Sequence, residues 1–459
     1  MAEQTAAGAT RAQGSGYANY VVLALFVVYT FNFIDRQIVA VMQEPIKAYF
    51  GLSDLQLGLL TGPAFAFLYA VLGIPIAYLA DRWNRVSIIS ISLAVWSGFT
   101  ALFGLVNSYM MLFLMRVGVG IGEAGCSPPA HSLISDYVPA QKRGAALSIY
   151  SLGIPIGSVL GILMTAIVYR WVADYYEVNG APDWLAAIGA DVAWRVPFLI
   201  IGIPGVLLAI AVKLTIREPK RGQQDRPSAA LPPGSQTSLM DVVRALSGKP
   251  SFWFVAFAAA IASLVGYGLF PWLLSYFIRI ALAAGVAPQD ALANAAIPYS
   301  FVVGGGGVVG TLLGGFLTDR FGAKRVSAYV VIPGSALLIS LPIYFLSLSI
   351  PPNALAFLLL GIASALGSMW YGPVWAVAQN LVQPSMRAMA PAVLLLIINI
   401  IGLGIGPPAV GALSDFFRES YGDQALRYAI MAIAAMIIPA AGLFLLAGRS
   451  MDKDWEAEK

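Results

Sequence analysis

Four ionisable side chains lie inside long apolar runs of the sequence, where charge is unusual. Asp35 and Arg36 lie in the first run, and Arg116 and Glu123 lie in the glycine-rich segment 116–126. A charged group is expensive in hydrocarbon and is kept there where it faces a water-filled cavity or a partner charge. The carboxyl groups could exchange protons and the guanidinium groups could bind an anion, so these residues predict a functional site.

Arg116 and Glu123 are expected on one face of a helix, because seven residues correspond to about 700° of rotation. Asp35 lies about 15 residues, or roughly 22 Å, into its run, and Arg116 lies about seven residues, or roughly 10 Å, into its own run from the opposite side. The two should meet at a similar depth, which predicts an ion pair between them. A static pair that only joins two helices is the alternative interpretation.

Glu123 is expected near the middle of its run, without a basic neighbour at its own depth. Burial disfavours the charged form of a carboxyl group, so this residue is expected to exchange protons at ordinary pH. The hypothesis is that Asp35 and Glu123 take up and release protons while Arg36 or Arg116 meets an anionic group. A protonated glutamate that is only hydrogen-bonded within a helix bundle is the alternative.

Membrane-spanning helices are the elements that must position these residues. Of the 459 residues, 59% are hydrophobic and 11% are charged, whereas roughly a quarter of the residues of a soluble protein are charged. Twelve apolar runs reach or approach the ~20 residues that a helix needs to cross a bilayer, and they lack the alternation of membrane strands. The prediction is an all-α polytopic membrane protein with 12 transmembrane helices.

The chain is expected to form two six-helix halves. Most Lys and Arg residues outside the runs lie on the side of the chain ends, which predicts cytoplasmic termini and a multi-pass protein of the inner (plasma) membrane. The longest connection is rich in Pro, Gly, Ser and charged residues and is typical of a flexible linker. The predicted divisions are a disordered N-terminal tail at 1–17, helix bundles at 18–216 and 251–449, a cytoplasmic linker at 217–250 and a cytoplasmic tail at 450–459.

Cysteine and histidine occur once each, as Cys126 and His131. One cysteine excludes an internal disulfide, and one histidine disfavours a zinc site made of protein ligands. Gly248-Lys249 lacks the earlier glycine of a nucleotide-binding loop and is followed by Pro250. His131 and the serine after it point in different directions on a helix, which disfavours a Ser/His enzyme. We therefore predict no catalytic residue, no metal and no cofactor.

Two motifs of the first half of the sequence, which we call echoes, recur in the second half. The segment 81–85, Asp-Arg-Trp-Asn-Arg, follows the second run, and the segment 319–325, Asp-Arg-Phe-Gly-Ala-Lys-Arg, follows the eighth. Pro129 with Arg143 also recurs, at the same spacing, in the second half. Two echoes in matching order indicate an internal repeat, and repeated six-helix halves are a plan of membrane transporters.

With these motifs the sequence resembles the major facilitator superfamily over essentially the whole chain. Segment 81–85, together with Asn32-Phe-Ile-Asp-Arg in the first run and Arg116 to Glu123 in the fourth, is similar to the Spinster branch. The eukaryotic members of that branch move sphingosine-1-phosphate and lysophospholipids. The resemblance implies a major facilitator fold and a conformational latch at the helix ends. The latch residues would be Asp81, Arg82, Arg85, Asp319, Arg320 and Arg325.

Aromatic and amide side chains, rather than charges, occupy the spans of the second half. An amphipathic substrate, with its head towards the first half and its tail towards the second, would suit this asymmetry. Each aromatic side chain could instead simply pack or lie at the membrane interface. The predicted substrate-binding residues are Arg36, Arg116, Tyr267, Trp370, Tyr371, Gln379 and Asn380.

Together these observations predict a proton-coupled secondary transporter that works by alternating access and is not an enzyme. The expected substrate is an amphipathic anionic or zwitterionic lipid-like molecule of the lysolipid or sphingosine-phosphate type. A proton-coupled efflux carrier for drugs or small organic anions is the alternative; an intramembrane enzyme or a sensor that transports nothing fits the repeats less well. The expected partners are the substrate, protons and membrane lipids, with no nucleic acid, and the chain is expected to be a monomer.

Overall fold

A computed structural model describes residues 2–223, 239–383, 386 and 389–456. Helices and short connections account for these ranges, with no strand among them. The chain divides into two compact units, which are described separately below. Unit 1 comprises residues 1–38 and 68–232, and unit 2 comprises residues 39–67 and 233–459.

Two helices, α1 and α4, run from one unit into the other, and the rest lie within a unit. The helices that belong wholly or mainly to unit 1 are α1 (Ala2–Val41), α4 (Pro63–Ala80), α5 (Arg85–Phe103), α6 (Tyr109–Glu123), α7 (Ser127–Tyr137), η1 (Ala140–Lys142), α8 (Arg143–Ser151), α9 (Gly153–Asn179), α10 (Asp183–Ala187), η2 (Ala193–Arg195) and α11 (Val196–Thr215). Those of unit 2 are α2 (Gln43–Phe50), α3 (Asp54–Thr61), α12 (Leu239–Ser247), α13 (Pro250–Ala283), α14 (Pro288–Gly322), α15 (Ala328–Ser349), α16 (Ala354–Ser368), α17 (Tyr371–Asn380), α18 (Met389–Ile398), η5 (Asn399–Leu403), α19 (Gly404–Tyr421), η6 (Gly422–Gln424), α20 (Ala425–Ala434) and α21 (Ile437–Asp454).

Eleven helical segments in the described ranges are long and apolar enough to cross a membrane. The last of them, Met389–Asp454, is 66 residues long, which corresponds to roughly 99 Å of helix and is enough for two crossings. The chain turns within this segment at Gly422, whose φ of 52° lies in the region that favours glycine. This architecture confirms the predicted all-α membrane fold and agrees with 12 crossings.

The predicted tail at 1–17 and the predicted linker differ from the structure in part. Residues 2–17 belong to α1, where disorder is predicted. Residues 217–223 are bound to unit 1, because Arg221 donates to the carbonyl oxygens of Ala80 and Trp83 at 2.7 and 2.8 Å. Residues 224–238, the middle of the predicted linker, lie outside the described residues, and the linker's last part forms α12.

Glycines allow close helix packing within unit 1. Gly153, Gly157 and Gly161 on α9 face α1, and a Cβ atom added to Gly157 would lie 2.4 Å from the carbonyl oxygen of Thr30. Small residues at a spacing of four let two backbones approach in this way. These three glycines therefore allow the close packing of α1 against α9.

Replacing Gly157 with alanine is expected to destabilise the protein by about 1–3 kcal/mol, because the added methyl group forces α1 and α9 apart. Equilibrium unfolding in lipid bicelles measures this effect. Gly98→Ala on α5 is the matched control, since no atom lies within 4 Å of the added Cβ. The control should be neutral or stabilising by up to about 1 kcal/mol through helix propensity. Equal stability of the two variants would contradict the close-packing account.

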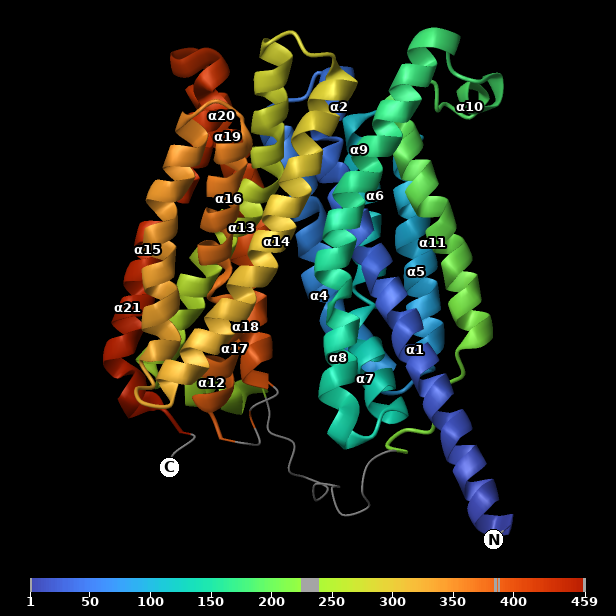
Figure 1. Ribbon diagram of the computed structural model, residues 1–459, viewed down its shortest axis with the longest axis vertical. Helices are drawn as coiled ribbons and strands as arrows, with labels where there is room; N and C mark the ends of the chain where they lie inside the picture. Colours follow the sequence, from blue (N-terminus) through green and yellow to red (C-terminus); the bar gives the residue numbers. More distant parts are fainter. Residues whose placement is uncertain (1, 224–238, 384–385, 387–388, 457–459) are drawn as a thin grey trace. The chain divides into compact units, whose positions relative to one another are not determined.

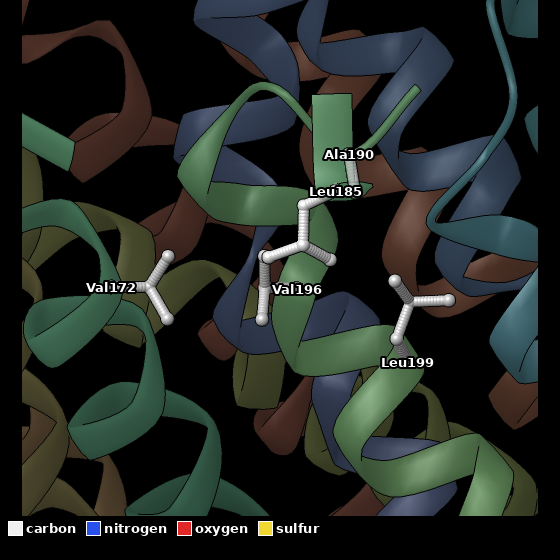
Figure 2. Packing of buried hydrophobic residues seen from close by; sticks show 5 residues of the cluster. All are labelled: Val172, Leu185, Ala190, Val196 and Leu199. Atoms are coloured by element: carbon white, nitrogen blue, oxygen red, sulfur yellow. The ribbon is translucent and has the colours of Figure 1, made fainter. Parts of the chain in front are cut away.

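One end of unit 1 is closed by a small apolar cluster (Figure 2). Leu185 and Ala190, from α10 and the loop after it, pack with Val172 of α9 and with Val196 and Leu199 of α11. In unit 2, α14 packs along α13, α15 and α16, and α15 also packs along α16 (Figure 1). Both units thus consist of long helices that pack along their lengths, which gives their side chains fixed depths.

Candidate functional site

A break in a membrane-spanning segment positions Glu123. Helix α6 ends at this residue and α7 begins at Ser127. Pro128 and Pro129 occupy the first turn of α7, where the absence of an N–H group is tolerated but continuation from α6 is not. Glu123 therefore lies at the last turn of α6, beside an interruption of the helix and within the core of unit 1.

The corresponding segment of unit 2 is broken at the equivalent place. Helix α16 ends at Ser368 and α17 begins at Tyr371, with Pro373 in its first turn. Trp370 lies at this joint and is buried, at 2% exposed. The sequence echo of Pro129 is thus also an echo in structure: each half of the chain interrupts one span, next to Glu123 in one unit and next to Trp370 in the other.

The structure pairs Glu123 with Arg36. Nε of Arg36 donates to Oε2 of Glu123 at 2.6 Å, and the side chain of Glu123 is 0% exposed. The guanidinium group of Arg36 also lies over the rings of Phe33 and Tyr69, 4.8 and 4.9 Å from their centroids, in the range of cation–π interactions. The prediction that Glu123 has no basic neighbour was wrong. The depth calculated from helical rise placed the backbone of Arg36 away from Glu123, but the long side chain of Arg36 reaches the carboxylate.

Asp35 and Arg116 are both buried, at 1% and 4% exposed. In the described part of the chain, the carboxylate oxygens of Asp35 form no hydrogen bond with Arg116, so the predicted pair is not hydrogen-bonded. The charges of Arg116 and Glu123 nevertheless act on Asp35, which lies beside Trp96 and Thr100 of α5. Asp35, Arg36, Arg116 and Glu123 therefore form one cluster, in which Arg36 and Glu123 form an ion pair.

Buried polar atoms are concentrated in this cluster. The amide group of Asn32 is buried beside Glu123, and the carboxyl group of Asp35 lies beside Trp96 and Thr100. Buried polar atoms are nearly always hydrogen-bonded or hydrated, so a cluster of this composition suits the passage of protons. No group of three His, Cys, Asp or Glu side chains suited to a metal ion occurs in the described ranges.

The predicted aromatic residues of unit 2 gather at the joint between α16 and α17. The rings of Trp370 and Tyr371 are stacked with centroids 4.1 Å apart, and Tyr267 lies close to Tyr371. Gln379 and Asn380 lie at the other end of α17, about nine residues or roughly 13 Å away. There the carbonyl oxygen of Asn380 accepts from the backbone N–H of Glu456 at 3.0 Å. The structure thus groups three of the five residues and separates the two amides from them.

The three predicted latch residues of unit 1 lie in different environments. Arg85 is 1% exposed and donates to Asp136 and Glu218 at 2.5 and 2.7 Å. Asp81 and Arg82 are exposed, and the guanidinium group of Arg82 lies 3.6 Å from the ring centroid of a neighbouring tyrosine. Arg85 is therefore part of the interior of unit 1, where it joins α5 to α7 and to the segment after α11.

The corresponding residues of unit 2 lie at the end of α14 and just after it. Asp319, Arg320 and Arg325 are exposed, and Asp319 accepts a hydrogen bond from the hydroxyl group of Tyr329 at 3.0 Å. The two copies of the motif thus differ: the last arginine is buried in an ion-pair network in unit 1 and exposed in unit 2. A latch role for either copy stays a prediction.

Sequence reasoning missed several neighbours of the charged cluster. Asn32 was available as part of the Asn-Phe-Ile-Asp-Arg motif, and it lies one turn before Arg36 on the same helix face. Tyr69, Trp96 and Thr100 come from α4 and α5, and nothing in their local sequence distinguishes them from ordinary span residues. Their contribution depends on the packing of three helices, which hydropathy does not specify.

Comparisons with known proteins identify the family. The family model described as Major Facilitator Superfamily matches residues 25–407. The chain is 32% identical over 435 residues to an MFS-type efflux pump of Mycolicibacterium smegmatis, covering 94% of this chain and 92% of that protein. It is 28% identical over 433 residues to the sphingosine-1-phosphate transporter SPNS2 of Danio rerio, covering 91% of this chain and 81% of that one.

A solved structure agrees with both. The crystal structure of a bacterial homologue of the human lysosomal transporter Spinster, in an inward-facing and unoccupied conformation, is 36% identical in sequence. It superposes with a TM-score of 0.85 and covers 96% of this chain and 98% of that chain. These relatives are transporters rather than enzymes. The chain therefore belongs to the major facilitator superfamily of membrane transporters and is a homologue of the Spinster proteins.

Proposed function

We propose that this transporter works by alternating access and couples protons to the movement of an amphipathic, anionic or zwitterionic lipid-like substrate. The observation that carries the proposal is the buried Arg36–Glu123 pair, in which a group able to bind an anion is held by a group able to accept a proton. Asp35 and Arg116 supply a second carboxylate and a second guanidinium group in the same cluster. The site thus contains groups able to bind a proton and an anion. It also lets the carboxylate of Glu123 and a substrate anion compete for the guanidinium group of Arg36.

The coupling follows from the charge of Glu123. While Glu123 is ionised, its carboxylate occupies the guanidinium group of Arg36 and disfavours an incoming anion. Protonation removes the negative charge, weakens the ion pair and frees Arg36 for a phosphate or carboxylate of the substrate. Release of the substrate restores the pair and expels the proton. Asp35, the other buried carboxyl group of the cluster, is the second proton carrier.

Lipid-like chemistry is favoured by what accompanies the charges. Rings of Phe33 and Tyr69 flank Arg36, so an anion that reaches this guanidinium group also meets apolar surface. Unit 2, taken by itself, offers an aromatic surface at the joint between α16 and α17, where the rings of Trp370 and Tyr371 are stacked. The name of the Danio rerio relative, a sphingosine-1-phosphate transporter, supports an amphiphile with a phosphate head.

A second candidate is a proton-coupled efflux carrier for drugs or small organic anions. It is favoured by one observation, the 32% identity to a mycobacterial protein named as an efflux pump. The same charged cluster serves either substrate, because Arg36 binds an anionic group whatever it is attached to. Only the requirement for an acyl chain separates the two functions.

Membrane placement is part of the proposal. The excess of Lys and Arg on the side of the chain ends favours cytoplasmic termini in the inner membrane. The bundles are proposed at 18–216 and 251–449, and the transporter is proposed to work as a monomer.

Flux into proteoliposomes tests the proposed substrate class. Lysophospholipids with acyl chains of increasing length, their deacylated head groups and a small organic anion are supplied with and without an imposed pH gradient. The proposal expects gradient-dependent flux of the acylated compounds and at least a tenfold lower flux of the deacylated heads. Equal flux of the head groups alone would favour the efflux-carrier alternative, and flux indifferent to the pH gradient would contradict proton coupling.

A further inference from the structure

The end of α14 carries a groove in which apolar side chains are followed by two cations. The groove has a volume of about 330 Å³ and is lined by Phe316, Leu317, Arg320, Phe321 and Lys324. Steps of four residues, from Phe316 to Arg320 and on to Lys324, place these side chains along one side of a helix and of the turn that follows it. This α14 groove lies outside the charged cluster of unit 1 and outside the aromatic joint of unit 2.

The length of α14 indicates the depth of the groove in a bilayer. The helix has 35 residues, and Gly305 is its middle. Counted from Gly305, Phe316 lies roughly 16 Å along the helix and Arg320 roughly 22 Å. With Gly305 at the centre of the bilayer, the hydrocarbon extends about 15 Å and the head groups about 20–22 Å in this direction. The ring of Phe316 therefore lies at the hydrocarbon edge, and the cations lie at the depth of lipid phosphates.

The groove is at the end of unit 2 that also holds the end of α21. Tyr329, at the start of α15, stacks on Trp455 with ring centroids 5.7 Å apart. Lys249, just before α13, contacts Glu456 at 2.7 Å. The end of α14 and the start of α13 thus lie at the same membrane surface as the last described residues of the chain. In the proposed topology this surface is cytoplasmic.

The two cations of the groove are available to an anion. Arg320 and Lys324 are exposed, and in the described ranges no acidic side chain forms an ion pair with either of them. Asp319 is the only acidic residue between positions 316 and 326. It does not line the groove, and its carboxylate accepts a hydrogen bond from the hydroxyl group of Tyr329 at 3.0 Å. The groove is therefore positively charged.

The first copy of the same sequence motif is built differently. In unit 1, Arg85 is buried and donates to Asp136 and Glu218. The guanidinium group of Arg82 lies 3.6 Å from the ring centroid of Tyr78. The cations of the first copy are thus engaged within unit 1, whereas those of the second copy face outward. This difference indicates that the second copy has a ligand of its own.

Apolar side chains continue the groove towards the middle of α14. Leu312, Leu313, Phe316 and Phe321 are 69%, 47%, 61% and 48% exposed. Leu312, Leu313 and Phe316 lie one to two turns before the cations and on the same side of the helix. An acyl chain that lies along them removes apolar surface from contact with other chains without any cost in hydration. A molecule that carries both a phosphate and an acyl chain therefore fits this surface better than a free anion does.

We propose that the α14 groove binds an anionic phospholipid of the surrounding bilayer, with the phosphate between Arg320 and Lys324 and an acyl chain along Phe316. The guanidinium group of arginine can bind two phosphate oxygens at once, and the ammonium group of lysine adds a point charge. A zwitterionic lipid brings a cation of its own next to these two, so the site selects a head group with net negative charge. Basic pockets beside transmembrane helices suit such head groups.

Native mass spectrometry of the full chain in detergent tests the site. Phosphatidylglycerol and phosphatidylcholine with the same acyl chains are added in equal amounts, and the first bound lipid is identified. Phosphatidylglycerol should bind at least about fivefold more tightly. The double variant Arg320→Gln with Lys324→Gln should lower its affinity at least about tenfold. Phe316→Ser keeps both cations and should lower the affinity at least about threefold, because it removes apolar contact with the acyl chain.

The matched control is Arg244→Gln with Arg449→Gln. It removes two exposed cations of unit 2 that lie outside the groove and should bind phosphatidylglycerol as the wild type does. An equal loss in this control would mean attraction to net charge alone and would overturn the proposal. Unchanged binding in the Arg320 and Lys324 double variant, or equal binding of phosphatidylcholine, would also overturn it.

A competition experiment separates the lipid from a free anion. Inorganic phosphate in tenfold excess over phosphatidylglycerol should leave the bound lipid in place, and its displacement would contradict the part assigned to the acyl chain. All the substituted side chains are exposed, so the variants are expected to fold as the wild type does. The readout needs neither a transported substrate nor a proton gradient, so failure of the proposed transport function would leave it unaffected.

Discussion

Glu123→Gln is expected to abolish flux driven by a pH gradient, lowering it at least tenfold, while the protein remains folded. Glutamine keeps the size and polarity of the side chain but cannot exchange a proton, so Arg36 is no longer held and released by a changing charge. Substrate binding should persist, because a neutral partner leaves the guanidinium group available to an anion. The expected phenotype is therefore loss of coupling with binding preserved.

Two measurements separate these effects. Gradient-driven flux in proteoliposomes reports coupling. The substrate-dependent change in the fluorescence of Trp96, which lies beside Asp35, reports binding. Glu177→Gln, which alters an exposed glutamate near the end of α9, is the matched control and should behave as wild type. If Glu123→Gln retained the wild-type response to the pH gradient, Glu123 would have no coupling role and Asp35 would be left as the only carboxylate of the cluster.

The largest effect on stability is expected from Arg85→Met. The side chain of Arg85 is 1% exposed, and its loss leaves the carboxylates of Asp136 and Glu218 near each other without the cation between them. Removing one partner of a buried ion pair costs about 3–5 kcal/mol. Because the side chain of Glu218 is 23% exposed, water can screen part of the remaining charge, and a loss near the lower value is expected.

Arg82→Met is the control for this substitution. Arg82 belongs to the same sequence motif but is exposed, with its guanidinium group over the ring of Tyr78, a contact worth about 0.5–1 kcal/mol at an exposed site. Equilibrium unfolding of both variants in bicelles should therefore differ by several-fold in the free energy lost. Similar losses would mean that the Arg85 network contributes little to unit 1.

The sequence predicted the fold and the location of the charged cluster because both depend on features that are local. Runs of apolar residues specify spans, and the echo of Pro129 in the second half specifies where a span is interrupted in each unit. Charges within a span can be recognised without knowledge of their neighbours, so Asp35, Arg36, Arg116 and Glu123 were all identified as candidates.

The partners of these charges could not be predicted in the same way. Depth along a helix placed Asp35 opposite Arg116, but hydrogen bonding depends on helix rotation and on side-chain length, and both favoured Arg36 with Glu123. The buried position of Asp54 was missed for a different reason. Asp54 follows Ser53 in a capping box with Gln56, which is typical of an ordinary helix start, and its hydrogen-bond partners Arg279 and Ser414 lie more than 200 positions away in the sequence.

The most direct test of the account is whether substrate movement carries protons through Glu123. A lysophospholipid is added to proteoliposomes that enclose a pH indicator, with no imposed gradient, and the internal pH is recorded as the substrate crosses. A pH change should accompany flux in the wild type and disappear in Glu123→Gln. Substrate flux in the wild type without any accompanying pH change would contradict it.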